Sequence, residues 1–298
     1  MAYQGLTRRE VLQLAAASGI GSFIGGGARA EAAALSAIGV QLYTVRDQVT
    51  KDAAATIKAV AEIGYKEVEV LQDTLPTVGP LAKQNGLTAV SMHLGGPFMA
   101  GPKSVPSGNA DLTATIASAK AAGIQYIVMP YIMPNDRPKD AAGFTALGTA
   151  LNKAGEQVKK AGLQFCYHNH AFEFTPLADG KRALDVLLAA ADPELLKLEL
   201  DVFWVSIAGA DPVSLINEQK GRVALMHLKD KMKGAPVSLT ESVPRTTFVE
   251  VGSGALDFPA ILKAASAAGV QHYFVEQDQT PGDPLESIRK SYQYLKSL

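Results

Sequence analysis

The feature of this sequence that most constrains its fold is a repeat of one strand and one helix. From Ile38 onward, short β-rich runs alternate with amphipathic segments rich in Ala, Leu and Lys. The eight candidate strands are IGVQLY from 38, YKEVEV from 65, LTAVSMH from 87, IQYIVM from 124, LQFCYHN from 163, LKLELD from 196, RVALMHL from 222 and VQHYFVE from 270. Five of these strands are preceded by a glycine that closes a helical pattern, which is typical of a helix that ends before the next strand.

Eight such units in about 260 residues predict a single (β/α)₈ TIM barrel, an α/β fold, over residues 31–298. A doubly wound open sheet is the alternative, but its Gly-rich phosphate-binding turn would follow the first strand, where this chain has QLYTVRD. Two irregular connections, residues 95–108 and 231–254, each follow a strand. We therefore expect both to lie over the C-terminal face of the barrel as parts of a rim or lid.

The first thirty residues differ from the rest of the chain. They contain the pair Arg8 and Arg9, an apolar Ala- and Gly-rich run over residues 11–27, and the small-x-small ending Ala28-Arg29-Ala30. This plan predicts a signal peptide over residues 1–30, and the arginine pair resembles a twin-arginine export signal. A permanent membrane anchor is the weaker alternative, because a spanning helix needs roughly 20 apolar residues. We expect the twin-arginine export machinery as a partner and a periplasmic mature protein.

Composition excludes two other classes of protein. The formal net charge is −1 and the charges are scattered, so the chain lacks the basic stripe that nucleic-acid binding requires. Cys166 is the only cysteine, which excludes an intramolecular disulfide framework and a zinc site built from thiolates.

Polar side chains end the predicted strands, where TIM barrels carry their catalytic groups. They are Gln41, Tyr43, Glu69, His93, His168, His170, Asp201, His227 and Glu276. A buried carboxylate without a partner costs several kcal/mol, and a divalent cation such as manganese, zinc, cobalt or magnesium would compensate it.

Four of these residues are the strongest candidates for metal ligands: His168, Asp201, His227 and Glu276. Each stands about five residues into its own strand, and equal counts give equal depth at roughly 3.3 Å per residue. Taken singly, a histidine in a strand is more often a core residue, and an acid at a strand end is more often a helix cap. Independent caps would have no reason to occur on four consecutive strands at one depth.

The two histidines of YHNH receive different roles. Side chains alternate along a strand, so His168 and His170 face the same side, about 6.6 Å apart. We expect His168 to bind the metal at the depth of the other ligands. We expect His170, nearer the rim, to contact the substrate or carry its proton.

Several phrases of the chain resemble the sugar phosphate isomerase/epimerase superfamily, the xylose isomerase-like barrels. The resemblance covers about residues 36–298, and its phrases are YHNHAFEF, LDVFWVSIAGADP, HLKD, VGSGALDF and FVEQD. It implies metal ligands at the ends of strands five to eight, which map onto His168, Asp201, His227 and Glu276. It also implies an isomerase, epimerase or lyase that acts on a sugar.

One position departs from the family. Ketose epimerases of this superfamily carry a glutamate where this chain has His168, and Glu173 is the nearest carboxylate that follows. The departure weakens a prediction of simple ketose 3-epimerisation and leaves Glu173 as an alternative ligand or base. Metal-assisted proton abstraction next to a carbonyl remains the expected chemistry, with His170, Glu173, Glu276 and Lys229 as candidate catalytic residues.

The DNA-cleaving branch of the superfamily, endonuclease IV, is excluded. That activity uses a trinuclear zinc cluster with many histidines and a basic groove, whereas this chain has five histidines.

A second group of strand-end residues fits a carbohydrate substrate: Gln41, Tyr43, Arg46, Glu69, His93 and Trp204. Trp204 either stacks on a sugar ring or plugs the barrel top. Because an exported enzyme seldom meets phosphorylated sugars, we expect a free sugar, keto-sugar or keto-glycoside. The alternative function is a non-catalytic periplasmic sugar-binding or accessory protein with the same barrel.

Overall fold

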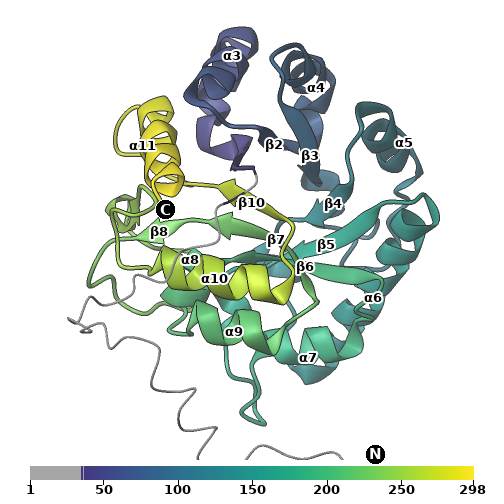
Figure 1. Cartoon of the computed structure of the whole chain (residues 1–298). Helices are drawn as coiled ribbons and strands as arrows, with labels where there is room; N and C mark the ends of the chain where they lie inside the picture. Colours follow the sequence, from purple (N-terminus) through teal and green to yellow (C-terminus); the bar gives the residue numbers. More distant parts are fainter. Residues whose placement is uncertain (1–34, 36) are drawn as a thin grey trace, which may run out of the picture. The chain divides into compact units, whose positions relative to one another are not determined.

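The computed structural model describes Leu35 and residues 37–298 and shows a closed barrel of parallel strands surrounded by helices (Figure 1). The barrel strands are β1 (Gly39–Gln41), β2 (Glu67–Leu71), β3 (Thr88–His93), β4 (Tyr126–Met129), β5 (Gln164–His168), β6 (Leu196–Asp201), β7 (Val223–Leu228) and β10 (His272–Val275). Closure is complete because β1 pairs with β10 on one side and with β2 on the other. The predicted TIM barrel is therefore confirmed, and the open sheet is excluded.

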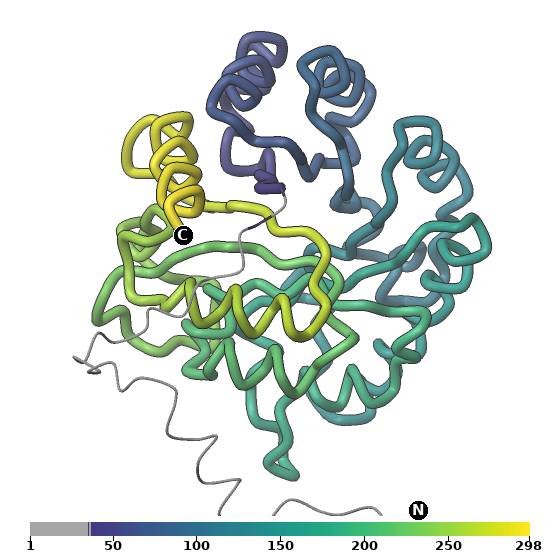
Figure 2. The backbone as a smooth tube through the Cα atoms, viewed as in Figure 1, coloured from purple at the N-terminus to yellow at the C-terminus, as the bar shows by residue number. Residues whose placement is uncertain are grey.

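The helices run along the outside of the barrel, as the backbone tube in Figure 2 shows. They are α2 (Arg46–Lys51), α3 (Ala53–Ile63), α4 (Leu75–Gln84), α5 (Thr113–Ala122), α6 (Ala141–Lys160), α7 (Ala183–Ala190), α8 (Val202–Ile207), α9 (Pro212–Glu218), α10 (Phe258–Ala268) and α11 (Pro284–Lys296). The five glycines that precede strands all have a positive φ, as the sequence predicts: Gly64, Gly86, Gly123, Gly162 and Gly269. Gly123 and Gly269 end α5 and α10 in the left-handed conformation, which an L side chain rarely adopts.

The interior of the barrel is apolar below its polar mouth. Cys166, Leu225 and Phe274 belong to one buried cluster inside the barrel. Each precedes a predicted site residue by two positions, so alternation places it one layer below that residue on the same inner face. This apolar layer therefore lies beneath the site.

The connection over residues 231–254 is more ordered than the sequence indicates. It contains an antiparallel hairpin of β8 (Asp230–Lys231) and β9 (Phe248–Val249). Both Asp230 carboxylate oxygens accept backbone N–H groups of the segment that follows the hairpin, those of Gly252, Gly254, Ala255 and Leu256. The hairpin was not predicted because two-residue strands are too short to show alternation.

The predicted signal peptide over residues 1–30 lies outside the described residues. Within residues 37–298, no helix combines the length and the apolar character that a membrane crossing requires.

Candidate metal and sugar site

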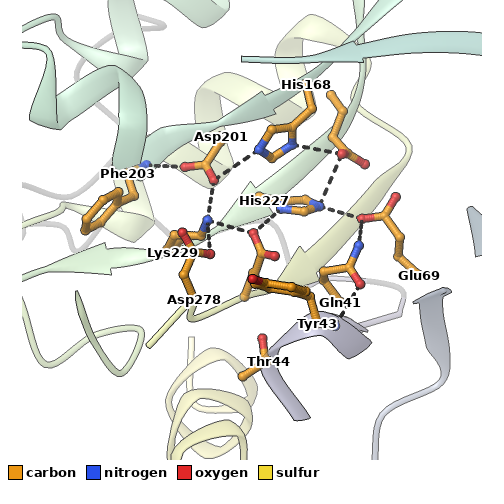
Figure 3. A network of polar contacts seen from close by, with 12 residues as sticks. Gln41, Tyr43, Thr44, Glu69, His168, Asp201, Phe203, His227, Lys229 and Asp278 are labelled. Atoms are coloured by element: carbon orange, nitrogen blue, oxygen red, sulfur yellow. Dashed lines mark hydrogen bonds and ion pairs between the residues drawn. The ribbon is translucent and has the colours of Figure 1, made fainter. Parts of the chain in front are cut away.

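The barrel brings the four predicted metal ligands together at the mouth. His168, Asp201, His227 and Glu276 each offer one ligand atom, and these atoms all lie within 4.8 Å of one another. All four side chains are buried. The strand register produces this convergence, because Asp201 is directly paired with His227 across β6 and β7. Figure 3 shows the three labelled members, His168, Asp201 and His227, pointing toward one another.

The atoms of this set fit a divalent cation. Asp201 Oδ1 caps α8 by accepting the backbone N–H groups of Phe203 and Trp204 at 2.8 and 3.0 Å. Asp201 Oδ2 is buried without a hydrogen bond of good angular geometry from any described residue, and it lies 3.6 Å from His168 Nε2. Asp201 thus caps α8 with one oxygen and presents the other toward His168 and toward Lys229 Nζ, which lies 2.9 Å away. Two imidazoles and two carboxylates form a donor set that suits zinc, manganese or cobalt.

Lys229 places a positive charge beside this set. Its Nζ lies 2.9 Å from Asp201 Oδ2, 2.7 Å from Glu276 Oε2 and 2.7 Å from Asp278 Oδ1. Burial alone would lower the pKa of Lys229, but the three carboxylates outweigh it and raise the pKa well above its usual value. These contacts favour the ammonium form, which is suited to stabilising negative charge.

Asp278 was not among the predicted residues, although a signal for it exists. Asp278 follows Glu276 by two positions. Because side chains alternate along a strand, it continues the same face just beyond the end of β10. Burial raises the pKa of Asp278 to about 6, and the charge of Lys229 opposes this rise.

A second layer of polar groups lies next to the first and shares two of its histidines. Glu199, which sequence reasoning missed, is fully buried on β6, and its Oε2 lies 2.9 Å from His168 Nδ1 and 2.8 Å from His93 Nε2. The alternation of LKLELD places Glu199 on the same face as Asp201, and this pattern could have revealed it. His93, His168, Glu199 and His227 form a second group with ligand atoms within 4.8 Å of one another.

Glu69 and Gln41 belong to this second layer. Glu69 Oε2 accepts the side-chain N–H of Gln41 at 2.7 Å and lies 2.6 Å from His227 Nε2. Burial would raise the pKa of Glu69, but the charges of His93 and His227 lower it well below its usual value. Both residues were predicted to bind substrate, and the structure places both beneath the cavity and away from its lining.

Above the two layers lies a cavity of about 510 Å³. Seven predicted site residues line it: Tyr43, His93, His168, His170, Trp204, Lys229 and Glu276. Both irregular connections contribute to its walls, through Gly95, Gly96 and Met99 from one and Glu241, Val243 and Phe248 from the other. The expected rim over the C-terminal face is therefore present.

His170 occupies the cavity wall just past the end of β5. Its ring centroid lies 5.0 Å from that of His168 and 5.3 Å from that of Trp204. Its Nδ1 and the Nε1 of Trp204 are buried and have no hydrogen-bond partner among residues 37–298. Burial, reinforced by the charge of Lys229, lowers the pKa of His170 well below its usual value, so the imidazole is neutral. Two buried ring nitrogens of the wall thus lack a partner among the described residues.

Glu173, predicted as a catalytic group or alternative ligand, lies behind this wall. Its Oε1 accepts the hydroxyl of Tyr167 at 2.6 Å, and its Oε2 accepts the backbone N–H of His170 at 2.8 Å. It does not line the cavity. Burial raises the pKa of Glu173 to about 8. These contacts give it a role in holding the His170 loop, so proton transfer by Glu173 remains a prediction that its position does not favour.

Arg46, predicted to bind substrate, also points away from the cavity. Its Nη1 donates to the carbonyl oxygen of Tyr43 at 2.7 Å, and its guanidinium lies over the Tyr43 ring. Arg137 pairs with Glu241 at 3.0 Å and donates to the hydroxyl of Tyr131. Among the described residues, no arginine lines the cavity.

The fold and the site together define a class. The chain is a TIM barrel whose candidate site lies at the C-terminal ends of its strands, where buried imidazoles and carboxylates form the floor of a cavity. Within that class, the family model described as "Xylose isomerase-like TIM barrel" matches residues 57–298. The protein belongs to this family.

Curated proteins of similar sequence match about half of the chain. An inosose dehydratase of Geobacillus thermodenitrificans (strain NG80-2) is 28% identical over 156 residues, which are 49% of this chain and 51% of the relative. The chain therefore spans about half the length of the curated relatives that it matches.

Two solved structures share the fold. A sugar phosphate isomerase/epimerase from Parabacteroides distasonis ATCC 8503 superimposes with a TM-score of 0.74 at 24% identity, covering 90% of this chain and 98% of that one. The structure of the IOLI protein with a binding zinc atom gives a TM-score of 0.67 at 15% identity, covering 88% of this chain and 98% of that one.

Proposed function

We propose that this protein is a divalent-metal-dependent enzyme that removes a proton next to the carbonyl group of an uncharged sugar, keto-glycoside or cyclitol. The observation that carries the proposal is that His170 lines one cavity with His168 and Glu276, two members of the buried set that Asp201 and His227 complete. The inosose dehydratases among the relatives favour loss of water as the outcome, and isomerisation or epimerisation shares the same first step.

The chain's own residues have distinct parts in this reaction. The bound cation would be held by His168, Asp201, His227 and Glu276 and would supply Lewis-acid stabilisation of the substrate oxygen. The neutral imidazole of His170 accepts the proton of the C–H bond, whose electron pair forms the C=C bond while the carbonyl oxygen takes up negative charge. The ammonium group of Lys229 stabilises that charge.

The second step decides the product. When water is lost, an oxygen electron pair re-forms the C=O bond and the C=C pair shifts to form a new double bond between the α and β carbons. The C–O bond at the β carbon breaks, and the hydroxyl leaves as water with the proton from His170. When the substrate is isomerised or epimerised, the proton is returned to carbon instead.

The charge of the cavity argues for an uncharged substrate. Asp73, Glu241, Glu276 and Asp278 line it with four carboxyl groups, and Lys229 is the one lysine in the lining. The ammonium of Lys229 is already paired with carboxylates at 2.7 to 2.9 Å. A phosphate group would therefore find no guanidinium and no unpaired ammonium among the described residues that line the cavity.

A non-catalytic sugar-binding protein is the second candidate. The observation in its favour is that Lys229 pairs with both Asp201 and Glu276, two of the four proposed ligands. A cation at the set would share these oxygens with Lys229 or displace it.

Isotope exchange separates the two candidates. The protein is stripped with chelator, divided, and one portion is reloaded with manganese. Inososes, keto-sugars and keto-glycosides are then incubated with both portions in deuterium oxide. The enzyme is expected to place deuterium next to the carbonyl, or to form an unsaturated ketone, only in the reloaded portion. Calorimetric heat from a sugar without exchange or product would identify a binder, and equal turnover after verified metal removal would refute metal dependence.

A further inference from the structure

His168 and His227 each lie between two layers of carboxylates, and each uses a different ring nitrogen for each layer. His168 presents Nδ1 to Glu199 at 2.9 Å, while its Nε2 lies on the side of Asp201. His227 presents Nε2 to Glu69 at 2.6 Å, while its Nδ1 lies 2.8 Å from Glu276. The four predicted ligands form one layer, and Glu69, Glu199, Gln41 and His93 form the other. Figure 3 labels His168, Asp201 and His227 of the first layer and Gln41 and Glu69 of the second.

The chemistry of imidazole makes this arrangement directional. A neutral imidazole carries one N–H donor and one lone pair, so a carboxylate that accepts from one nitrogen leaves the other as the acceptor. His168 Nε2 makes no hydrogen bond to a described residue and lies 3.6 Å from Asp201 Oδ2, as an unprotonated nitrogen would. Metal-bound histidines commonly donate their second N–H to a carboxylate, which fixes the tautomer and the ring orientation.

We propose that Glu199 and Glu69 are positioning residues of the metal site. With the cation bound, Glu199 would hold the proton of His168 on Nδ1 and Glu69 that of His227 on Nε2. His227 Nδ1, which lies 2.8 Å from Glu276 Oε2 in the metal-free structure, would exchange its proton for the cation. His168 Nε2 and His227 Nδ1 thereby direct their lone pairs to one cation, which Asp201 and Glu276 share. This inference rests on the proposed function only for the presence of the cation.

Both oxygens of Glu69 and one oxygen of Glu199 are already engaged, which suits them to positioning, while Glu199 Oε1 has no hydrogen-bond partner among the described residues. Glu69 accepts hydrogen bonds from Gln41 and from Ser91, in addition to His227. The Oε2 of Glu199 lies within 3.3 Å of nitrogens on three imidazoles, those of His93, His168 and His227. A cation in the inner layer would have to replace these three imidazole contacts, whereas in the outer layer it would compete with Lys229 Nζ, which lies 2.9 Å from Asp201 Oδ2.

Two measurements on the unmodified protein test the proposal. Nitrogen-15 NMR of the metal-free protein reports the tautomer of each neutral histidine, and His168 is expected to carry its proton on Nδ1. X-ray absorption of the zinc-loaded protein counts imidazole ligands: the outer set supplies two and the inner set supplies three. A His168 proton on Nε2, or three imidazoles around zinc, would overturn the proposal.

Substitution adds a matched comparison. In Glu199→Gln an amide replaces the carboxylate, so zinc affinity is expected to fall about 10- to 100-fold, with a change in the His168 tautomer. Glu67→Gln is the control, because Glu67 lies 2.9 Å from His272 Nδ1 at the other end of the barrel strands. The control is expected to keep the affinity of the unmodified protein. Equal zinc affinity and an unchanged tautomer in Glu199→Gln would refute the positioning role.

The outcomes also distinguish this inference from the proposed function. Zinc bound by two imidazoles with the expected tautomer, but no turnover of any sugar, would refute the proposed enzyme and leave the positioning role intact. Turnover of a sugar, together with unchanged zinc affinity and an unchanged His168 tautomer in Glu199→Gln, would support the proposed enzyme and refute the positioning role.

Discussion

At the scale of single residues, His168 and His170 have separate positions that predict separate effects. His168 belongs to both candidate ligand groups, whereas His170 belongs to neither and lines the cavity. We expect His168→Ala to lower metal content strongly. His170→Ala should retain the metal and lose about 10²- to 10⁴-fold in turnover, the usual contribution of a general base. Elemental analysis and steady-state kinetics measure the two effects.

The control for this pair is His272→Ala, because His272 pairs with Glu67 away from the cavity. That variant should keep both metal and turnover. Loss of metal from His170→Ala together with full metal in His168→Ala would contradict the assignment.

Glu173 predicts a pH dependence of stability. Its pKa is raised to about 8 in the folded protein by burial, against 4.5 as the ordinary value. Between these values the unfolded state has lost the proton that the folded state keeps, so stability falls as the pH rises. The slope from this group approaches about 1.4 kcal/mol per pH unit.

Glu173→Gln removes this titration and should show a shallower fall in stability between pH 5 and pH 8. Urea unfolding at several pH values measures the difference. Glu62→Gln serves as the control, since Glu62 is an exposed residue of α3. An identical pH profile for Glu173→Gln and the unmodified protein would show that Glu173 ionises normally.

The alternation of side chains along strands explains which site residues could be predicted from the sequence and which could not. Counting residues from each strand start found His168, Asp201, His227 and Glu276, because all four stand at or just past the C-terminal ends of neighbouring strands, although only Asp201 and His227 are direct register partners. Glu199 was missed because only the last residues of each strand were considered. The burial of Gln41 and Glu69 beneath the cavity depends on contacts across the barrel, which one strand's pattern does not contain.

At the scale of elements, the anchored hairpin β8–β9 gives a prediction about stability. A Cβ added to Gly254 would lie 2.2 Å from the carbonyl oxygen of Lys231 and 2.4 Å from Asp230 Oδ1. Gly254→Ala must therefore displace the segment that Asp230 holds, at a cost of about 3 kcal/mol. Urea unfolding measures this cost.

Gly282→Ala is the matched control, since nothing lies within 4 Å of a Cβ there. A loss of stability in Gly254→Ala no larger than in the control would show that the segment is not held tightly.

The elements themselves were predictable where their patterns were long. Eight strands were found because each carries four or more β-forming residues between a helix and the next loop, often after a glycine. The hairpin was not found, since its strands have two residues each and its stability comes from the Asp230 side chain.

At the scale of the whole molecule, the N-terminal residues predict a route of export. If residues 1–30 form a twin-arginine signal, Arg8→Lys with Arg9→Lys should leave full-length protein in the cytoplasm. The unmodified protein should appear in the periplasm, shortened near Ala30. Cell fractionation with N-terminal sequencing checks both forms, and periplasmic mature protein from the double variant would indicate another route.

The central claim, one cation held at the mouth of the barrel, has a direct test in anomalous diffraction from crystals of the zinc-loaded protein. The account predicts one anomalous peak about 2.0–2.2 Å from His168 Nε2, Asp201, His227 Nδ1 and Glu276, with Lys229 close by or displaced. A peak between His93 and Glu199 would contradict this claim, as would the absence of a peak in crystals kept in a zinc-containing solution.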